Sequence, residues 1–159
     1  MADSIGTTDC GGKPDTKRTE ACHPLHVNKY AMNILFVDDD KDTRDLFRLV
    51  FSLEGHSVEM AEDAPSALML LRDSKAHFDV TVVDYFMPGI NGLEMVRQFN
   101  QGRAPKQTSF VLFTRAHPGD LKQEAKELGI TFIVHKPTVT GRVVEAVEQA
   151  ARHRTRERA

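Results

Sequence analysis

Cysteine and long apolar segments are what this sequence has least of. Only two cysteines occur in 159 residues, Cys10 and Cys22, so a disulfide framework is not expected. No apolar run approaches the roughly 18 residues that cross a bilayer. The opening "MADSIGTTDC" also lacks the basic and apolar regions of a secretory signal peptide. These absences favour a cytoplasmic protein with free thiols and no contact with a membrane.

The charge is small overall but unevenly distributed. The formal net charge is −2, and residues 33–151 carry 18 acidic against 13 basic side chains. This acidic balance argues against a nucleic-acid-binding surface in that stretch. The last eight residues, "RHRTRERA", carry four arginines and one glutamate. We expect a solvated, frayed helix end there, with an electrostatic docking segment as the alternative.

The chain has room for one domain with tails. Residues 1–32 are polar without a sustained apolar repeat and are predicted to form a flexible arm, ahead of a domain over 33–153 and a tail over 154–159. Cys22 lies close to His23 and His26, a spacing at which zinc can bind. The paired two-ligand knuckles of zinc sites are missing, so metal binding by the arm is not favoured.

From Asn33 onward, strand and helix patterns alternate five times. The predicted strands are "NILFV", "HSVEM", "FDVTVV", "SFVLF" and a last one ending at His135. Apolar residues at helical spacing indicate three of the helices: Leu46, Leu49, Val50 and Leu53; Ala67, Leu68 and Leu71; and Val143, Val144 and Val147. Asp63 and Pro65 mark the start of one helix and Pro118 the start of another, while Gly55 and Gly129 mark helix ends. Strict alternation predicts an α/β fold, a doubly wound parallel sheet covered by helices on both faces.

Polar residues follow four of these strands at their carboxyl ends. Asp38 and Asp39 follow the first, Asp84 ends the third, Thr114 ends the fourth and Lys136 follows the fifth. Parallel strands bring such ends to one edge of the sheet. Clustered carboxylates repel one another unless a cation is present, and Mg²⁺ prefers such oxygen ligands. The pattern predicts a Mg²⁺-dependent phosphoryl-transfer site, with Asp40 or Asp42 interpreted as a helix cap.

The motifs "FVDDD", "VVDYFMPGINGLEM", "VLFT" and "VHKP" together resemble the receiver domain of two-component response regulators, over about residues 33–153. The resemblance implies a flavodoxin-like (βα)5 sheet in the order 2-1-3-4-5. It implies phosphorylation of Asp84 by a sensor histidine kinase or phosphotransfer protein, with Mg²⁺ held by Asp39, Asp84 and the Phe86 carbonyl. Asp38 would assist through water, and Lys136 would pair with the phosphoryl group.

The resemblance also implies a switch in which Thr114 moves towards the phosphoryl group. The output face would be formed by the fourth helix, the fifth strand and the fifth helix. Three positions depart from the family pattern. Arg115 replaces a small residue and could screen the site or contact the phosphoryl group. Ile133 replaces an aromatic residue coupled to the threonine, and Phe86 offers no polar group to orient water. A slow loss of the phosphoryl group is therefore expected.

Three functions remain open from the sequence. The favoured one is a stand-alone receiver resembling chemotaxis regulators, monomeric or weakly dimeric, that docks on an unidentified protein. A receiver-like module that works without phosphate is the second. A haloacid-dehalogenase-type phosphatase is the third, although its motif would need Thr or Val at Asp42, and Thr43 comes one residue late.

Overall fold

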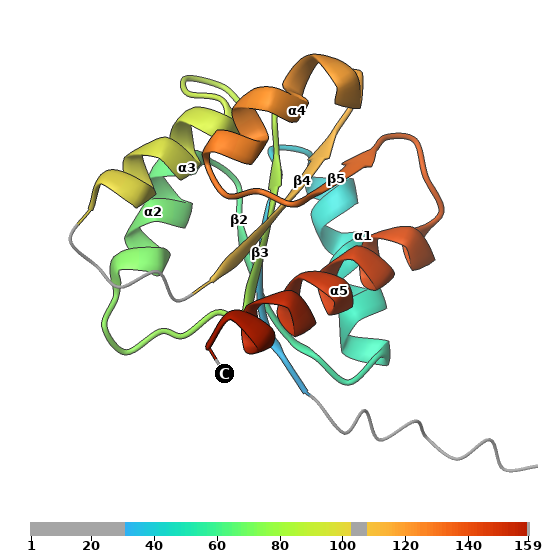
Figure 1. Ribbon diagram of the computed structural model, residues 1–159. Helices are drawn as coiled ribbons and strands as arrows, with labels where there is room; N and C mark the ends of the chain where they lie inside the picture. The colour runs from blue at the N-terminus through green and yellow to red at the C-terminus, as the bar shows by residue number, and fades with distance from the viewer. Residues whose placement is uncertain (1–30, 103–107, 159) are drawn as a thin grey trace, which may run out of the picture.

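The computed structural model describes residues 31–102 and 108–158 (Figure 1). Strands and helices alternate five times along them, as predicted. The strands are β1 (Asn33–Val37), β2 (Ser57–Ala61), β3 (Val80–Asp84), β4 (Ser109–Thr114) and β5 (Phe132–His135). The helices are α1 (Lys41–Leu53), α2 (Ala64–Arg72), α3 (Gly92–Gln101), α4 (Pro118–Glu127) and α5 (Thr140–Arg158). Cys10, Cys22, His23 and His26 lie outside the described residues.

The sheet is parallel throughout, and its strand order is β2-β1-β3-β4-β5. This order confirms the predicted flavodoxin-like fold. The chain winds outward from β1 in both directions, so a crevice forms where the order reverses, at the carboxyl ends of β1 and β3. Val37 pairs with Val83 in the register, which places the residues that follow these two strands side by side.

Helices cover both faces of the sheet (Figure 1). Each face has its own hydrophobic core. Alternate residues of each strand point to opposite faces, so Ile34 and Phe36 of β1 lie in one core while Leu35 and Val37 lie in the other. The first core is completed by α1 and α5, including Val143 and Val147 as predicted. The second is completed by α2, α3 and α4.

The buried face of α1 differs from the apolar repeat that predicted the helix. Leu46, Leu49 and Leu53 are 49%, 59% and 76% exposed, whereas Phe47 and Phe51 are buried. The ring of Phe47 stacks on that of Phe36 at 4.8 Å and meets the Phe113 ring edge-on at 5.4 Å. Aromatic rings bury more apolar surface than leucines, so the two phenylalanines determine which side of α1 faces the sheet.

The helix ends follow the local signals. Asp40 is the N-cap of α1, and its side chain accepts a hydrogen bond from the Asp42 amide, as its capping interpretation requires. Asp63 caps α2 in the same way, with Pro65 in the first turn. At the other end of the chain, α5 continues without a break through His153 into the arginine-rich end. There Arg154 donates hydrogen bonds to the carbonyls of Phe78 and Asp79.

None of the helices in the described ranges is long and apolar enough to span a bilayer.

We expect His56 to make stability depend on pH. Its ring is 5% exposed, burial lowers its pKa, and its Nδ1 accepts a hydrogen bond from the Met32 amide. The unfolded chain therefore takes up a proton at a higher pH than the folded one. The free energy of unfolding should fall as the pH drops below about 6.5, with a slope of up to about 1.4 kcal/mol per pH unit from this group. Urea unfolding between pH 7 and 5 checks this, and the same pH slope in His56→Gln would contradict it.

Candidate functional site

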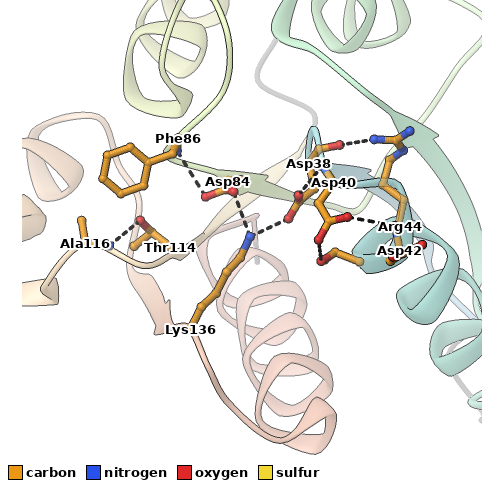
Figure 2. Close-up of polar contacts among 10 residues, drawn as sticks. Asp38, Asp40, Asp42, Arg44, Asp84, Phe86, Thr114, Ala116 and Lys136 are labelled. Carbon is orange, nitrogen blue, oxygen red and sulfur yellow. Dashed lines mark hydrogen bonds and ion pairs between the residues drawn. The ribbon is translucent and has the colours of Figure 1, made fainter.

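Four strand ends deliver polar side chains to one edge of the sheet, as the sequence predicts (Figure 2). Asp84 and Thr114 are the last residues of β3 and β4, and Asp38 and Lys136 directly follow β1 and β5. All four are buried, in spite of their polarity. Buried polar groups need partners, and in the described part of the chain no buried side-chain nitrogen or oxygen lacks one.

The Lys136 ammonium lies between two carboxylates. Its Nζ is 2.6 Å from Oδ2 of Asp38 and 2.8 Å from Oδ2 of Asp84 (Figure 2). It also lies 4.5 Å from the ring centroid of Phe113. One ammonium facing two carboxylates leaves the crevice with excess negative charge. Burial raises the pKa of Asp38, the hydrogen bond from Lys136 opposes this rise, and the charge of Asp84 adds to it. An additional cation would stabilise the ionised crevice.

The donor set fits a hard divalent cation. Asp38, Asp39 and Asp84 each offer a carboxylate oxygen, and these atoms lie within 4.8 Å of one another. Three carboxylates supply the oxygen ligands that Mg²⁺ takes, and exposed Asp39 leaves one side open to water and to a phosphoryl oxygen. The Phe86 amide donates to Oδ1 of Asp84 at 3.2 Å, so the backbone of residue 86 lies beside the same carboxylate. Its carbonyl oxygen is a proposed fourth protein ligand.

Thr114 is fully buried, and its Oγ1 accepts a hydrogen bond of 3.0 Å from the Ala116 amide (Figure 2). Its carbonyl accepts a 2.7 Å hydrogen bond from the Lys136 amide. The hydroxyl is therefore tied to the loop after β4, while the backbone is tied to the residue that carries the ammonium.

The three unusual positions differ in their surroundings. Arg115 is exposed, and its carbonyl oxygen lies 3.1 Å from Nε2 of His135. Ile133 is half-buried against the core under α2, α3 and α4, and Phe132 packs against the opposite core. Phe86 is 53% exposed, with its ring edge-on to that of Tyr85. Arg115 and Phe86 are the two that remain open to solvent.

Sequence reasoning missed two residues that shape the crevice. Arg44 of α1 donates a hydrogen bond of 2.7 Å to the backbone carbonyl of Asp38. Gly92, the first residue of α3, packs against the backbone of Asp84 so closely that a Cβ would lie 2.2 Å from its carbonyl oxygen. The glycine belongs to the Asn-Gly pair within "VVDYFMPGINGLEM", but its contact with the backbone of Asp84 depends on the tertiary fold.

Asp40 lies outside the proposed ligand set. Its Oδ1 accepts from the Asp42 amide and its Oδ2 from the hydroxyl of Thr43. A phosphatase of the haloacid-dehalogenase type would need the carboxylate at this position for its chemistry. Here both oxygens of the Asp40 carboxylate cap α1 instead, which argues against the phosphatase alternative.

Similarity to known proteins identifies the family of this chain. Residues 34–148 match the response regulator receiver domain. The two-component response regulator ARR22 of Arabidopsis thaliana is 28% identical over 142 residues, covering 87% of this chain and 93% of that protein. The response regulator MprA of Mycobacterium sp. strain KMS is 42% identical over 67 residues, covering 42% of this chain and only 28% of MprA.

Solved structures agree with this match. The chemotaxis protein CheY4 of Vibrio cholerae is 28% identical with a TM-score of 0.68, covering 76% of this chain and 99% of that one. A CheY-like receiver domain protein of Methanospirillum hungatei has a TM-score of 0.72 at 20% identity, covering 80% and 99%, and supports the fold alone. With the fold, the strand-end residues and the match over most of its length in agreement, the chain belongs to the response regulator receiver domain family.

Proposed function

We propose that this receiver accepts a phosphoryl group on Asp84 from the phosphohistidine of a sensor histidine kinase or phosphotransfer protein, with Mg²⁺ bound. The observation that carries the proposal is the Lys136 ammonium, held 2.6 Å from Asp38 and 2.8 Å from Asp84, beside the third carboxylate of Asp39. A buried carboxylate that faces an ammonium and a cation site can attack a phosphoryl group, because the two positive charges neutralise the phosphoryl oxygens.

The transfer exchanges one bond for another. A carboxylate oxygen of Asp84 attacks phosphorus, the P–N bond to the donor imidazole breaks, and the imidazole nitrogen leaves with the electron pair. The product is an acyl phosphate on Asp84 and a histidine in the donor. Lys136 neutralises charge on the phosphoryl oxygens, and it already lies within hydrogen-bond distance of Asp84. Bound Mg²⁺ would supply further neutralisation of the same oxygens, held by Asp39, Asp84 and the Phe86 carbonyl.

The same contacts suggest how phosphorylation alters a surface. A phosphoryl group on Asp84 offers acceptor oxygens to the Thr114 hydroxyl, which here accepts from the Ala116 amide. Moving that hydroxyl releases the loop that leads to His117, the N-cap of α4. The face of α4, β5 and α5 contains a groove of about 580 Å³, lined by Ile133, His135 and Arg142 among others. We propose this face as the surface whose affinity for a protein target changes.

Intact mass spectrometry tests the proposed chemistry. The 159-residue protein is incubated with acetyl phosphate and Mg²⁺, with a parallel sample in which a chelator removes the metal. The proposal predicts a gain of one phosphoryl group, about 80 Da, in the Mg²⁺ sample alone. If this small donor gives no adduct, the same comparison is made with a phosphorylated histidine phosphotransfer domain. Failure with both donors, under conditions in which Mg²⁺ binds, would favour a module that works without phosphate.

We expect Phe86→Gln to shorten the lifetime of the phosphoryl group by about tenfold. Phe86 is 53% exposed beside Asp84, and an amide at this position could hydrogen-bond the water that attacks phosphorus, which the native ring cannot. Phe86→Leu is the matched control, because it removes the ring without adding a polar group. The decay of the phosphorylated species is followed by intact mass. Equal lifetimes in Phe86→Gln and Phe86→Leu would contradict the effect assigned to a polar group at position 86.

A further inference from the structure

Asp38 is held from four directions. Its amide donates to the carbonyl of Ala61 at 3.2 Å, and its Oδ1 accepts from the Asp40 amide at 3.0 Å. Its Oδ2 accepts from Lys136 at 2.6 Å. Its carbonyl oxygen accepts from Nη1 of Arg44 at 2.7 Å (Figure 2). Lys136 already has a role in the proposed chemistry, whereas Arg44, which makes the fourth contact, has none so far.

The Arg44 guanidinium is well placed for this contact. Its side chain is 14% exposed, and charged donors make the stronger hydrogen bonds to carbonyl oxygens. It also lies 3.7 Å from a carboxylate oxygen of Glu62, but that side chain is 72% exposed, and surface pairs of this kind contribute little. The hydrogen bond to the Asp38 carbonyl is therefore the main contact that this partly buried guanidinium offers to the crevice.

The carbonyl in question belongs to the peptide bond that joins Asp38 to Asp39. A peptide group is planar, so fixing its oxygen also fixes the orientation of the amide and Cα of the next residue. We propose that Arg44 is a positioning residue for the cation site, because its hydrogen bond orients this peptide and so holds the exposed Asp39 carboxylate within reach of Asp84. The inference rests on the proposed Mg²⁺-dependent function and adds a residue to it.

The sign of the effect separates positioning from simple charge. A guanidinium near a divalent cation repels it, so if Arg44 acted through its charge alone, removing it would tighten Mg²⁺ binding. If Arg44 acts by orienting the peptide, removing it weakens Mg²⁺ binding, as the loss of groups that orient metal ligands generally does. The two roles predict opposite changes in one measured affinity.

The experiment is a Mg²⁺ titration of the full chain, followed through its backbone amide NMR signals. Arg44→Gln is expected to bind Mg²⁺ about tenfold more weakly than wild type, and Arg44→Lys, which keeps a donor, by a smaller factor. Arg48→Gln is the matched control, because Arg48 is an exposed arginine one turn further along α1, and its affinity should match wild type. Thermal melts without Mg²⁺ measure how far each variant affects folding.

Unchanged or tighter Mg²⁺ binding in Arg44→Gln would overturn the inference, even if the melting temperature fell, because the residue would then be structural or simply repulsive. If Arg44→Gln does not fold, Arg44→Lys decides, and wild-type affinity in that variant also overturns it. Phosphorylation with acetyl phosphate is measured alongside at saturating Mg²⁺. Wild type that binds Mg²⁺ but accepts no phosphoryl group from acetyl phosphate or from a phosphorylated histidine phosphotransfer domain would contradict the proposed function and leave the positioning role standing, whereas wild type that binds no Mg²⁺ would remove both.

Discussion

Asp84→Asn is expected to abolish phosphoryl acceptance while leaving the protein folded. An amide oxygen is a poor nucleophile for phosphorus, and the change also removes one of the three carboxylates that could hold Mg²⁺. The fold should tolerate it, because Lys136 keeps its 2.6 Å contact with Asp38 and the crevice loses one of its mutually repelling charges. Intact mass after incubation with acetyl phosphate and Mg²⁺ should show no adduct in the variant.

Asp73→Asn is the matched control for this experiment. It makes the same chemical change at the exposed C-cap of α2, away from the strand ends, and should accept the phosphoryl group like wild type. Circular dichroism melts establish that both variants are folded. An adduct of undiminished yield on folded Asp84→Asn would mean that another side chain is the acceptor, and the roles given to Asp84 and Lys136 would have to be abandoned.

Gly92→Ala is expected to lower the free energy of unfolding by about 3 kcal/mol or more. A Cβ at this position would lie 2.2 Å from the Asp84 carbonyl oxygen and 3.1 Å from a methyl carbon of Val83. The nearest of these atoms is backbone of a central strand, so it cannot move aside as the end of a flexible side chain can. Either α3 or the end of β3 has to shift, and the second shift would displace the proposed phosphoryl acceptor.

Gly141→Ala is the control, because Gly141 lies in the first turn of α5 and an added Cβ there meets nothing within 4 Å. Alanine is the better helix former by up to about 1 kcal/mol, so this variant should be as stable as wild type or more so. Urea unfolding compares the three proteins. A Gly92→Ala protein within about 0.5 kcal/mol of wild type would contradict the close packing of α3 on the acceptor strand.

The fold could be predicted from the sequence because the strand ends, the helix caps and the strand-helix alternation all indicate the same topology. Each strand end is marked by a polar residue or a breaker, and Asp40 and Asp63 mark helix starts that the structure confirms. Neighbouring parallel strands then bring Asp38 and Asp84 together through backbone pairing alone. Short-range signals and a regular topology are therefore enough to locate this crevice without knowledge of any side-chain contact.

What the sequence could not reveal depends on packing across the fold. Helix α1 carries leucines on one side and Phe47 and Phe51 on another, and either side could face the sheet. The phenylalanines are buried because Phe47 packs against the rings of Phe36 and Phe113 in the sheet. The contact of Arg44 with a carbonyl carries no sequence signature, because any arginine in a first helical turn looks solvated. The roles given to Phe86, Arg115 and Ile133 depend on a state with bound phosphoryl and remain predictions.

The role of Asp84 is tested most directly by identifying the residue that carries the phosphoryl group. Protein phosphorylated in the presence of Mg²⁺ is treated with borohydride, which reduces an aspartyl phosphate to homoserine, and is then digested and sequenced by mass spectrometry. Phosphorylation of Asp84 predicts homoserine at position 84 and nowhere else. Homoserine at position 38 or 39, or a phosphoryl group that survives borohydride on a serine, threonine or histidine, would contradict the central role of Asp84.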